Sequence, residues 1–237
     1  MMKKLIFGGL LLLMLACQTA EVEKSKSTKV LKTEQQENLW IEYEFDTLKQ
    51  KKDGYYKEYN LVDGKKILFL EKTIKDGLSR GEEKQYYPNG QLAASFQYNE
   101  KGQLEGPVKY YFPDGKLKQE GHYQADALAD SLKTYYPNGR LKERVFMVEN
   151  MANGPFEEFY QNGQLKAKGL YVDNIEHCEL WIYDQDSTGS LESKMLCDSQ
   201  LKTCATFWKA KEGPVEGVND FAKSTIEKMR PQCEPLK

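Results

Sequence analysis

The chain has 237 residues, with 34 Lys and Arg against 36 Asp and Glu, so its formal net charge is only −2. This near balance supplies neither a basic excess for binding nucleic acid nor a long acidic tail. The mean hydropathy of −0.71 is low, yet 12% of the residues are aromatic, which argues against a disordered chain. We expect a thin, tyrosine-rich sheet with much exposed surface.

The first residues have the pattern of a secretory signal. Lys3 and Lys4 precede an uncharged apolar run over residues 5–16. This run is too short to span a bilayer, which needs about 20 apolar residues, and its length is typical of the h-region of a signal peptide. We therefore expect residues 1–16 to be a signal peptide. A short buried apolar segment is the alternative.

Cys17 follows this run directly. The segment Met14-Leu15-Ala16-Cys17 resembles the bacterial lipobox, in which small residues precede a cysteine that becomes acylated, although leucine is usual at the position of Met14. The resemblance implies a lipoprotein held at a membrane by acyl chains, such as palmitate, on Cys17. A plain signal peptide is the alternative. Gln18 replaces the aspartate that retains some lipoproteins in the inner membrane, so the analogy favours the outer membrane of the cell envelope. Whether the protein then faces the periplasm or the cell surface stays open.

Residues 17–37 are polar, mixed in charge and nearly free of large apolar groups. Such a segment buries too little surface to offset the entropy lost on ordering. The composition predicts a flexible tether over 17–37 and a folded part that begins at residue 38.

Pairs of residues ending in glycine recur through the folded part at nearly constant spacing. Their glycines are separated by 26, 25, 24, 24 and 26 residues, and they are Gly64, Gly90, Gly115, Gly139, Gly163 and Gly189. Most of these pairs are Asn-Gly or Asp-Gly, which are typical of tight hairpin turns because those turns need residues with φ > 0. The repetition predicts six hairpin units, or about 12 strands.

The strand after each glycine alternates in character. One unit places Leu141, Val145 and Met147 at even offsets from its glycine, and Lys142 and Arg144 at odd offsets. A period of two predicts one buried face and one solvent-exposed face. A lone hairpin is marginally stable in water, so we expect the hairpins to stack side by side into one elongated single-layer sheet over residues 38–201. Where Gly121 and Gly169 occupy a buried position, we expect neighbouring aromatic rings to fill the space.

The repeated unit resembles a known family. The pattern Tyr-Tyr-x-Asn-Gly-x-Leu, as at residues 86–92, with a tyrosine near the eighth position after the glycine, resembles the bacterial variant of the MORN repeat. The resemblance is clear over residues 80–172 and weaker at 54–79 and 173–197. It implies an all-β fold of repeated hairpins. It also implies either a scaffolding role or an antitoxin-like role against a toxin.

Four cysteines lie in the last quarter of the chain: Cys178, Cys197, Cys204 and Cys233. Cys178 and Cys197 are equidistant from the tip of the sixth turn, so we expect a cross-strand disulfide between them, which leaves Cys204 for Cys233. Residues 202–237 would then form a disulfide-linked cap with a short helix over 218–230 that covers the sheet edge. The alternatives are free thiols or a metal site from His177, Cys178, Cys197 and Cys204, which lacks a Cys-x-x-Cys pair.

No catalytic motif, phosphate loop or metal-ligand spacing stands out, so the sequence predicts a protein that is not an enzyme and has neither a cofactor nor a metal. One aromatic side chain per unit forms a candidate binding stripe, made of Tyr86, Tyr111, Tyr135 and Phe159. The leading hypothesis is a membrane-anchored binding or scaffold module for a protein or an envelope polymer, with no nucleic-acid partner. An immunity or antitoxin role is the alternative, followed by a structural protein and an envelope enzyme.

Overall fold

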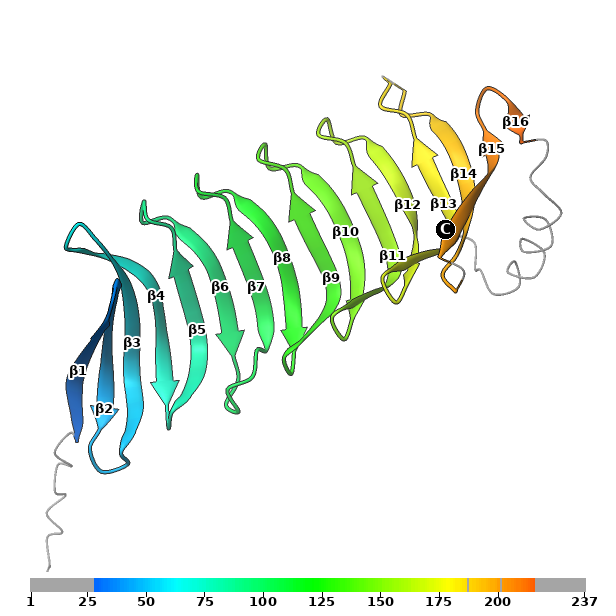
Figure 1. Cartoon of the computed structure of the whole chain (residues 1–237). Coiled ribbons are helices and arrows are strands. Elements are labelled where there is room, and N and C mark those ends of the chain that lie inside the picture. Colours follow the sequence, from blue (N-terminus) through cyan, green and yellow to red (C-terminus); the bar gives the residue numbers. More distant parts are fainter. Residues whose placement is uncertain (1–27, 187, 201, 216–237) are drawn as a thin grey trace, which may run out of the picture.

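The structure, a computed structural model, describes residues 28–186, 188–200 and 202–215 (Figure 1). This part of the chain is all-β and forms one antiparallel sheet of 16 strands, in which each strand pairs with the next along the chain. Figure 1 shows a long, twisted ribbon of a single layer, with β1 and β16 at opposite ends. The strands are β1 Lys29–Gln36, β2 Leu39–Asp46, β3 Lys51–Val62, β4 Lys65–Lys75, β5 Leu78–Tyr86, β6 Leu92–Tyr98, β7 Gly106–Tyr111, β8 Leu117–Gln124, β9 Ala127–Tyr135, β10 Leu141–Val148, β11 Met151–Phe159, β12 Leu165–Val172, β13 Ile175–Tyr183, β14 Leu191–Asp198, β15 Thr203–Lys209 and β16 Gly213–Pro214. Within these ranges, no helix is long and apolar enough to cross a membrane.

The six predicted hairpins are present as β3 to β14, and the sheet continues beyond them at both ends. Residues 29–36, which the composition placed in the flexible tether, instead form β1 and pair with β2. This strand is almost entirely exposed, so it adds backbone hydrogen bonds and polar contacts rather than buried area. One such contact is the ion pair between Lys29 and Asp53, at 2.6 Å. At the other end, β15 and β16 occupy part of the predicted cap, and the predicted helix at 218–230 lies outside the described residues.

The glycine turns line one long edge of the ribbon, the upper edge in Figure 1. In the second unit, the Gly90 amide donates to the carbonyl of Tyr87 at 2.9 Å, and the Tyr87 amide donates to the carbonyl of Gln91 at 2.8 Å. The glycine takes φ 83°, a left-handed conformation that favours this residue, so the predicted turns are confirmed.

The opposite edge carries three two-residue turns without glycine, at residues 125–126, 149–150 and 173–174, that the repeat pattern did not reveal. Glu149 and Asn150 join β10 to β11 with φ of 49° and 68°. The Asn150 amide donates to the carbonyl of Leu128, one unit earlier, at 3.0 Å, and its side-chain oxygen accepts from the Leu128 amide at 2.7 Å. The same pair of bonds recurs in the neighbouring units at Asp126 and Asn174. These bonds hold successive turns together.

The predicted alternation of faces is confirmed. In β10, Val145 and Met147 are buried, whereas Lys142 and Arg144 are exposed. Buried residues gather in two clusters, which we assign to the apolar face of the sheet. The first, over β2–β4, is built on Ile41, Tyr43, Tyr56, Leu70 and Ile74, and the second, over β10–β12, on Val145, Met147, Phe156 and Ala167.

The expectation for the two buried glycines holds at one of them. A methyl group added at Gly169 would lie 2.8 Å from the ring of Phe156, so an aromatic ring does fill that space. At Gly121 the nearest atoms belong to Leu128 and Leu132, so aliphatic side chains fill the space instead.

The disulfide pairing differs from the prediction. Cys197 of β14 lies directly opposite both Cys178 of β13 and Cys204 of β15. The bond joins Cys197 to Cys204, whose Cα atoms are 4.0 Å apart, and Cys178 is disulfide-bonded as well. Cys197 and Cys204 are also equidistant from the tip of the turn that joins their strands. Spacing in the sequence therefore does not distinguish Cys204 from Cys178 as the partner of Cys197. Cys233 lies outside the described residues.

Candidate functional site

One side chain from each of 14 consecutive strands lies on a single line across the face opposite the apolar face. We call this line the lateral row and its side the charged face. Each member is directly opposed to the next in the strand register. At 4.7–4.9 Å per strand, the row is roughly 60 Å long. From β2 to β15 its members are Glu42, Lys57, Glu71, Lys84, Ser95, Lys109, Glu120, Lys133, Arg144, Glu157, Lys168, Trp181, Lys194 and Trp208.

In the N-terminal half of the row, carboxylates and ammonium groups alternate except at Ser95, which lies between Lys84 and Lys109, and some of them pair with one another. Lys57 lies 3.4 Å from Glu71, and Lys133 lies 3.6 Å from Glu120. At the far N-terminal end, Glu42 accepts hydrogen bonds from Trp40 and Tyr59 and pairs with Lys66 at 2.9 Å. The Lys66 contact, ahead of the two hydrogen bonds, lowers the pKa of Glu42. The charges of this half are therefore largely satisfied within the protein.

The predicted stripe of Tyr86, Tyr111, Tyr135 and Phe159 lies on the same face, each residue two positions after a member of the lateral row. All four side chains are half-buried. The hydroxyl of Tyr86 donates to Glu71 at 2.6 Å, and that of Tyr135 donates to Glu120 at 2.7 Å. Burial and these carboxylates raise the pKa of both tyrosines to about 12. These two rings are therefore fixed beside the row by carboxylates.

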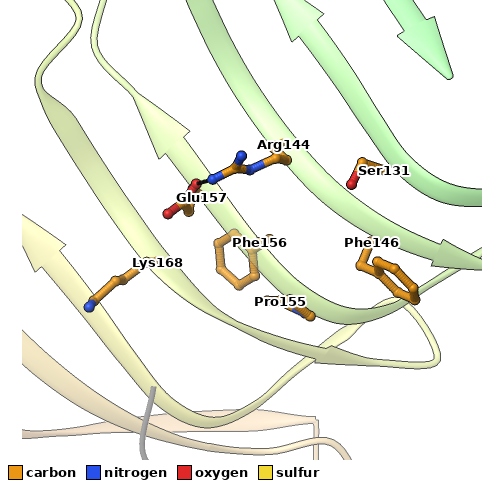
Figure 2. Close-up of a pocket in the computed structure, with 7 residues that line it drawn as sticks. All are labelled: Ser131, Arg144, Phe146, Pro155, Phe156, Glu157 and Lys168. Carbon is orange, nitrogen blue, oxygen red and sulfur yellow. Dashed lines mark hydrogen bonds and ion pairs between the residues drawn. The ribbon is translucent and has the colours of Figure 1, made fainter. Parts of the chain in front are cut away.

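The order of charges reverses in the middle of the row. Lys133 of β9 is directly opposed to Arg144 of β10, so two cations adjoin where the pattern predicts a carboxylate. Arg144 pairs instead with Glu157 on its other side. Figure 2 shows Arg144 and Glu157 pointing toward one another at a shallow depression of about 270 Å³, which Lys168, Phe146 and Pro155 also line. The lateral row is therefore hollowed at its centre.

At its C-terminal end the row becomes a ladder of lysine and tryptophan, made of Lys168, Trp181, Lys194 and Trp208. The ammonium groups of Lys168 and Lys194 lie over the ring of Trp181, 4.4 Å and 4.5 Å from its centre. Lys194 also lies 5.9 Å from the ring centre of Trp208. Across the described residues, neither lysine has a carboxylate within salt-bridge distance. This ladder thus differs in kind from the paired charges at the other end.

This ladder was not predicted from the sequence, although the sequence contains a signal for it. Lys84, Lys109, Lys133, Glu157 and Trp181 recur at spacings of 25, 24, 24 and 24 residues, the same period as the turns. The predicted stripe lies two positions later in each unit, at aromatic residues, because aromatic residues dominate interfaces. Trp208, the member of the row in β15, does not fit this period, because the sixth turn is longer than the others and a register shift follows between β14 and β15.

The apolar face also holds titratable groups. Glu143 and Glu158 are directly opposed across β10 and β11, a pair that the search for neighbouring carboxylates in the sequence could not find. Burial, and then the charge of Glu158, raise the pKa of Glu143. Glu158 itself pairs with Lys166 at 2.9 Å. Further along this face, buried Glu83 accepts a hydrogen bond from Lys72 at 3.3 Å.

The alternative metal site is wrong, because Cys197 and Cys204 are consumed by a disulfide. Elsewhere in the described ranges, no group of three or more His, Cys, Asp and Glu residues is arranged to hold a metal ion. His177 of β13 lies 3.2 Å from the hydroxyl of Ser199, in the turn that follows β14.

Comparison with known proteins supports the repeat assignment. The MORN repeat variant family matches residues 80–100, 104–125 and 152–173, which cover most of the hairpins β5–β6, β7–β8 and β11–β12. No curated protein matches the chain. A solved structure with some likeness is a mutant of S. aureus TarM in complex with fondaparinux, alpha-GlcNAc-glycerol and UDP, at 12% identity and a TM-score of 0.24. The match covers 43% of this chain and 21% of that one, and it carries no argument about function. Three of the hairpin units are therefore similar to the MORN repeat variant.

Proposed function

We propose that the protein is a membrane-anchored binding module, in which acyl chains on Cys17 hold the chain at the outer membrane and the lysine–tryptophan ladder binds a partner with anionic groups. MORN repeats are generally binding and scaffolding modules, which supports a binding role. The observation that carries the proposal is that Lys168 and Lys194 flank Trp181 without a carboxylate partner among the described residues.

The ladder is suited to binding because its groups are already positioned. A lysine held over an aromatic ring loses less side-chain freedom when a ligand arrives than one that is free in solvent. Tryptophan and cationic residues also contribute strongly to binding energy at interfaces. Carboxylates or phosphates of a partner would supply the counter-charge that Lys168 and Lys194 lack.

The dimensions of the ladder restrict the partner. Lys168 and Lys194 lie on strands two steps apart, so their positions are separated by about 9–10 Å. Toward the N-terminus, the row carries Glu157, Glu120 and Glu71, which repel a long polyanion. The partner is therefore a protein segment or an envelope polymer with a short anionic stretch rather than a nucleic acid.

A pull-down from native membranes tests the binding surface. The variant Lys168→Gln/Lys194→Gln removes both ammonium groups of the ladder, and Lys118→Gln/Lys142→Gln removes two exposed lysines from the same face at the same change in net charge. The proposal predicts that crosslinked partner is lost roughly 10-fold from the first variant, through about 1.4 kcal/mol of binding energy, and retained by the second. Equal recovery by both variants would contradict it.

Fractionation tests the anchor separately. Cys17→Ser should move the protein from the outer-membrane fraction to the soluble envelope fraction, because the acyl chains that hold it would be absent. The purified Cys17→Ser protein should still bind its partner, because the ladder is unchanged. Retention of this variant in the membrane would disprove the anchor without affecting the binding surface.

A further inference from the structure

Among the described residues, β1 is the edge strand of the sheet and pairs only with β2, so its outer side has backbone groups without partners in this part of the chain. Thr28 and Thr47 are opposed in the register, and the Thr47 amide donates to the carbonyl of Thr28 at 3.1 Å. In an antiparallel pair, opposed residues alternate between bonded and non-bonded, so the even-numbered residues of β1 bond to β2. The odd-numbered residues therefore direct their N–H and C=O groups away from the sheet; these are Lys29, Leu31, Thr33 and Gln35.

We propose that β1 pairs antiparallel with β1 of a second copy of this chain, with Thr33 of both copies opposed on a two-fold axis. Outward-directed groups must meet outward-directed groups, so only odd-numbered residues can be bonded to odd-numbered residues. The register centred on Thr33 meets this requirement. It opposes Lys32 to Glu34, and the two-fold axis repeats this pair.

The charges select this register over its neighbours. The next register toward the N-terminus is centred on Lys32, which places Lys32 of one copy directly opposite Lys32 of the other. The next register toward the C-terminus is centred on Glu34 and places two carboxylates opposite each other. Like charges directly opposed across an antiparallel pair are destabilising.

Contacts within one copy hold these charges at the edge. Lys32 lies over the ring of Phe45, 3.5 Å from its centre, and Glu34 accepts a hydrogen bond from Tyr43 at 2.5 Å. Both side chains lie on the apolar face, so they meet their counterparts on one side of the joined sheet. Pairing would also cover Val30 and Leu31, which are 44% and 60% exposed. Lysines on an edge strand usually prevent such pairing, whereas here Lys32 is opposed by Glu34.

The last described strand does not offer an equivalent edge. β16 is two residues long, Gly213 and Pro214, and proline has no N–H to donate. Pairing through β1 therefore gives a closed dimer of two joined ribbons rather than an open chain of them. This association does not depend on the partner proposed for the ladder on the charged face.

Cysteine crosslinking of the full-length protein in native membranes tests the register. Opposed bonded residues have Cα atoms about 5.5 Å apart, within the span of a disulfide, so Thr33→Cys should form a reducible dimer under mild oxidation. The matched control is Gln35→Cys, which is also exposed and also on the free edge. In the proposed register, position 35 of the two copies is separated by four residue steps, about 13 Å, so this variant should crosslink no more than the wild type.

Charge reversal supplies a second measurement. In the Thr33→Cys protein, Lys32→Glu should reduce crosslinking severalfold, and the double reversal Lys32→Glu/Glu34→Lys should restore it. Equal crosslinking by Thr33→Cys and Gln35→Cys, or an unchanged yield after Lys32→Glu, would overturn the proposed pairing.

Discussion

Tyrosine hydroxyls bond successive glycine turns to one another, and the interface between the third and fourth turns lacks this bond. The hydroxyl of Tyr136 donates to the carbonyl of Phe159 at 2.8 Å, and the second and fifth units make the same contact at 2.7 Å and 2.9 Å. Phe112 occupies the equivalent position in the third unit and has no hydroxyl, so the carbonyl of Tyr135 receives no such bond. We predict that Phe112→Tyr stabilises the sheet by supplying the missing donor.

The expected gain follows from the net value of one neutral hydrogen bond, about 0.5–1.5 kcal/mol. In a sheet of this size, 1 kcal/mol corresponds to a shift in the melting temperature of about 2–4 °C. The reverse change, Tyr136→Phe, should lower the melting temperature by a similar amount. Because the stability of a repeat array is close to a sum over units and their interfaces, each change should act locally.

Thermal unfolding followed by circular dichroism gives the measurement, and Tyr55→Phe is the control. Tyr55 is 37% exposed, and across the described residues its hydroxyl has no hydrogen-bond partner. Its replacement should leave the melting temperature unchanged. If Phe112→Tyr and Tyr136→Phe both behave like this control, the bonds between turns do not contribute to stability and the reasoning is wrong.

Two further predictions concern the C-terminal strands and the apolar face. Peptide mapping under non-reducing conditions should recover Cys197 linked to Cys204, and should link Cys178 to a third cysteine, for which Cys233 is our expectation; a Cys178–Cys197 peptide would contradict the structure. Glu143→Gln should raise stability at neutral pH and leave it nearly unchanged at pH 4. Folding raises the pKa of Glu143, so at this group the folded protein binds more protons than the unfolded protein. Glu143 therefore lowers the stability as the pH rises from the pKa of the unfolded state through the pKa of the folded state. Urea unfolding at both pH values checks this, and an equal effect of the substitution at both would refute it.

The hairpin architecture could be predicted because its determinants are local. Each Asn-Gly or Asp-Gly turn needs a left-handed glycine, and the alternation of Val145 and Met147 with Arg144 assigns the faces. The two-residue turns on the other edge were missed because Glu149 and Asn150 adopt positive φ without a glycine to mark them. Asparagine tolerates this conformation, but its side-chain bond to the preceding unit is visible only in the folded sheet.

Features that depend on the register between strands could not be predicted from the composition of the sequence. β1 was assigned to the tether because its residues are polar, yet an edge strand needs backbone partners more than buried area. Cys197 lies on β14, between Cys178 on β13 and Cys204 on β15, so its spacing from the two in the sequence could not decide which of them is its partner. The lysine–tryptophan ladder likewise arises only when Lys168, Trp181 and Lys194 are brought together from three strands.

Photocrosslinking at two consecutive residues tests most directly whether the charged face binds the partner. Tyr183 lies on the charged face, two residues after Trp181, and Ile182 lies on the apolar face; both are half-buried. A benzophenone amino acid at position 183 should capture a partner in native membranes, and the same group at 182 should not. Capture at 182 alone, or equal capture at both positions, would contradict the assignment of binding to the charged face.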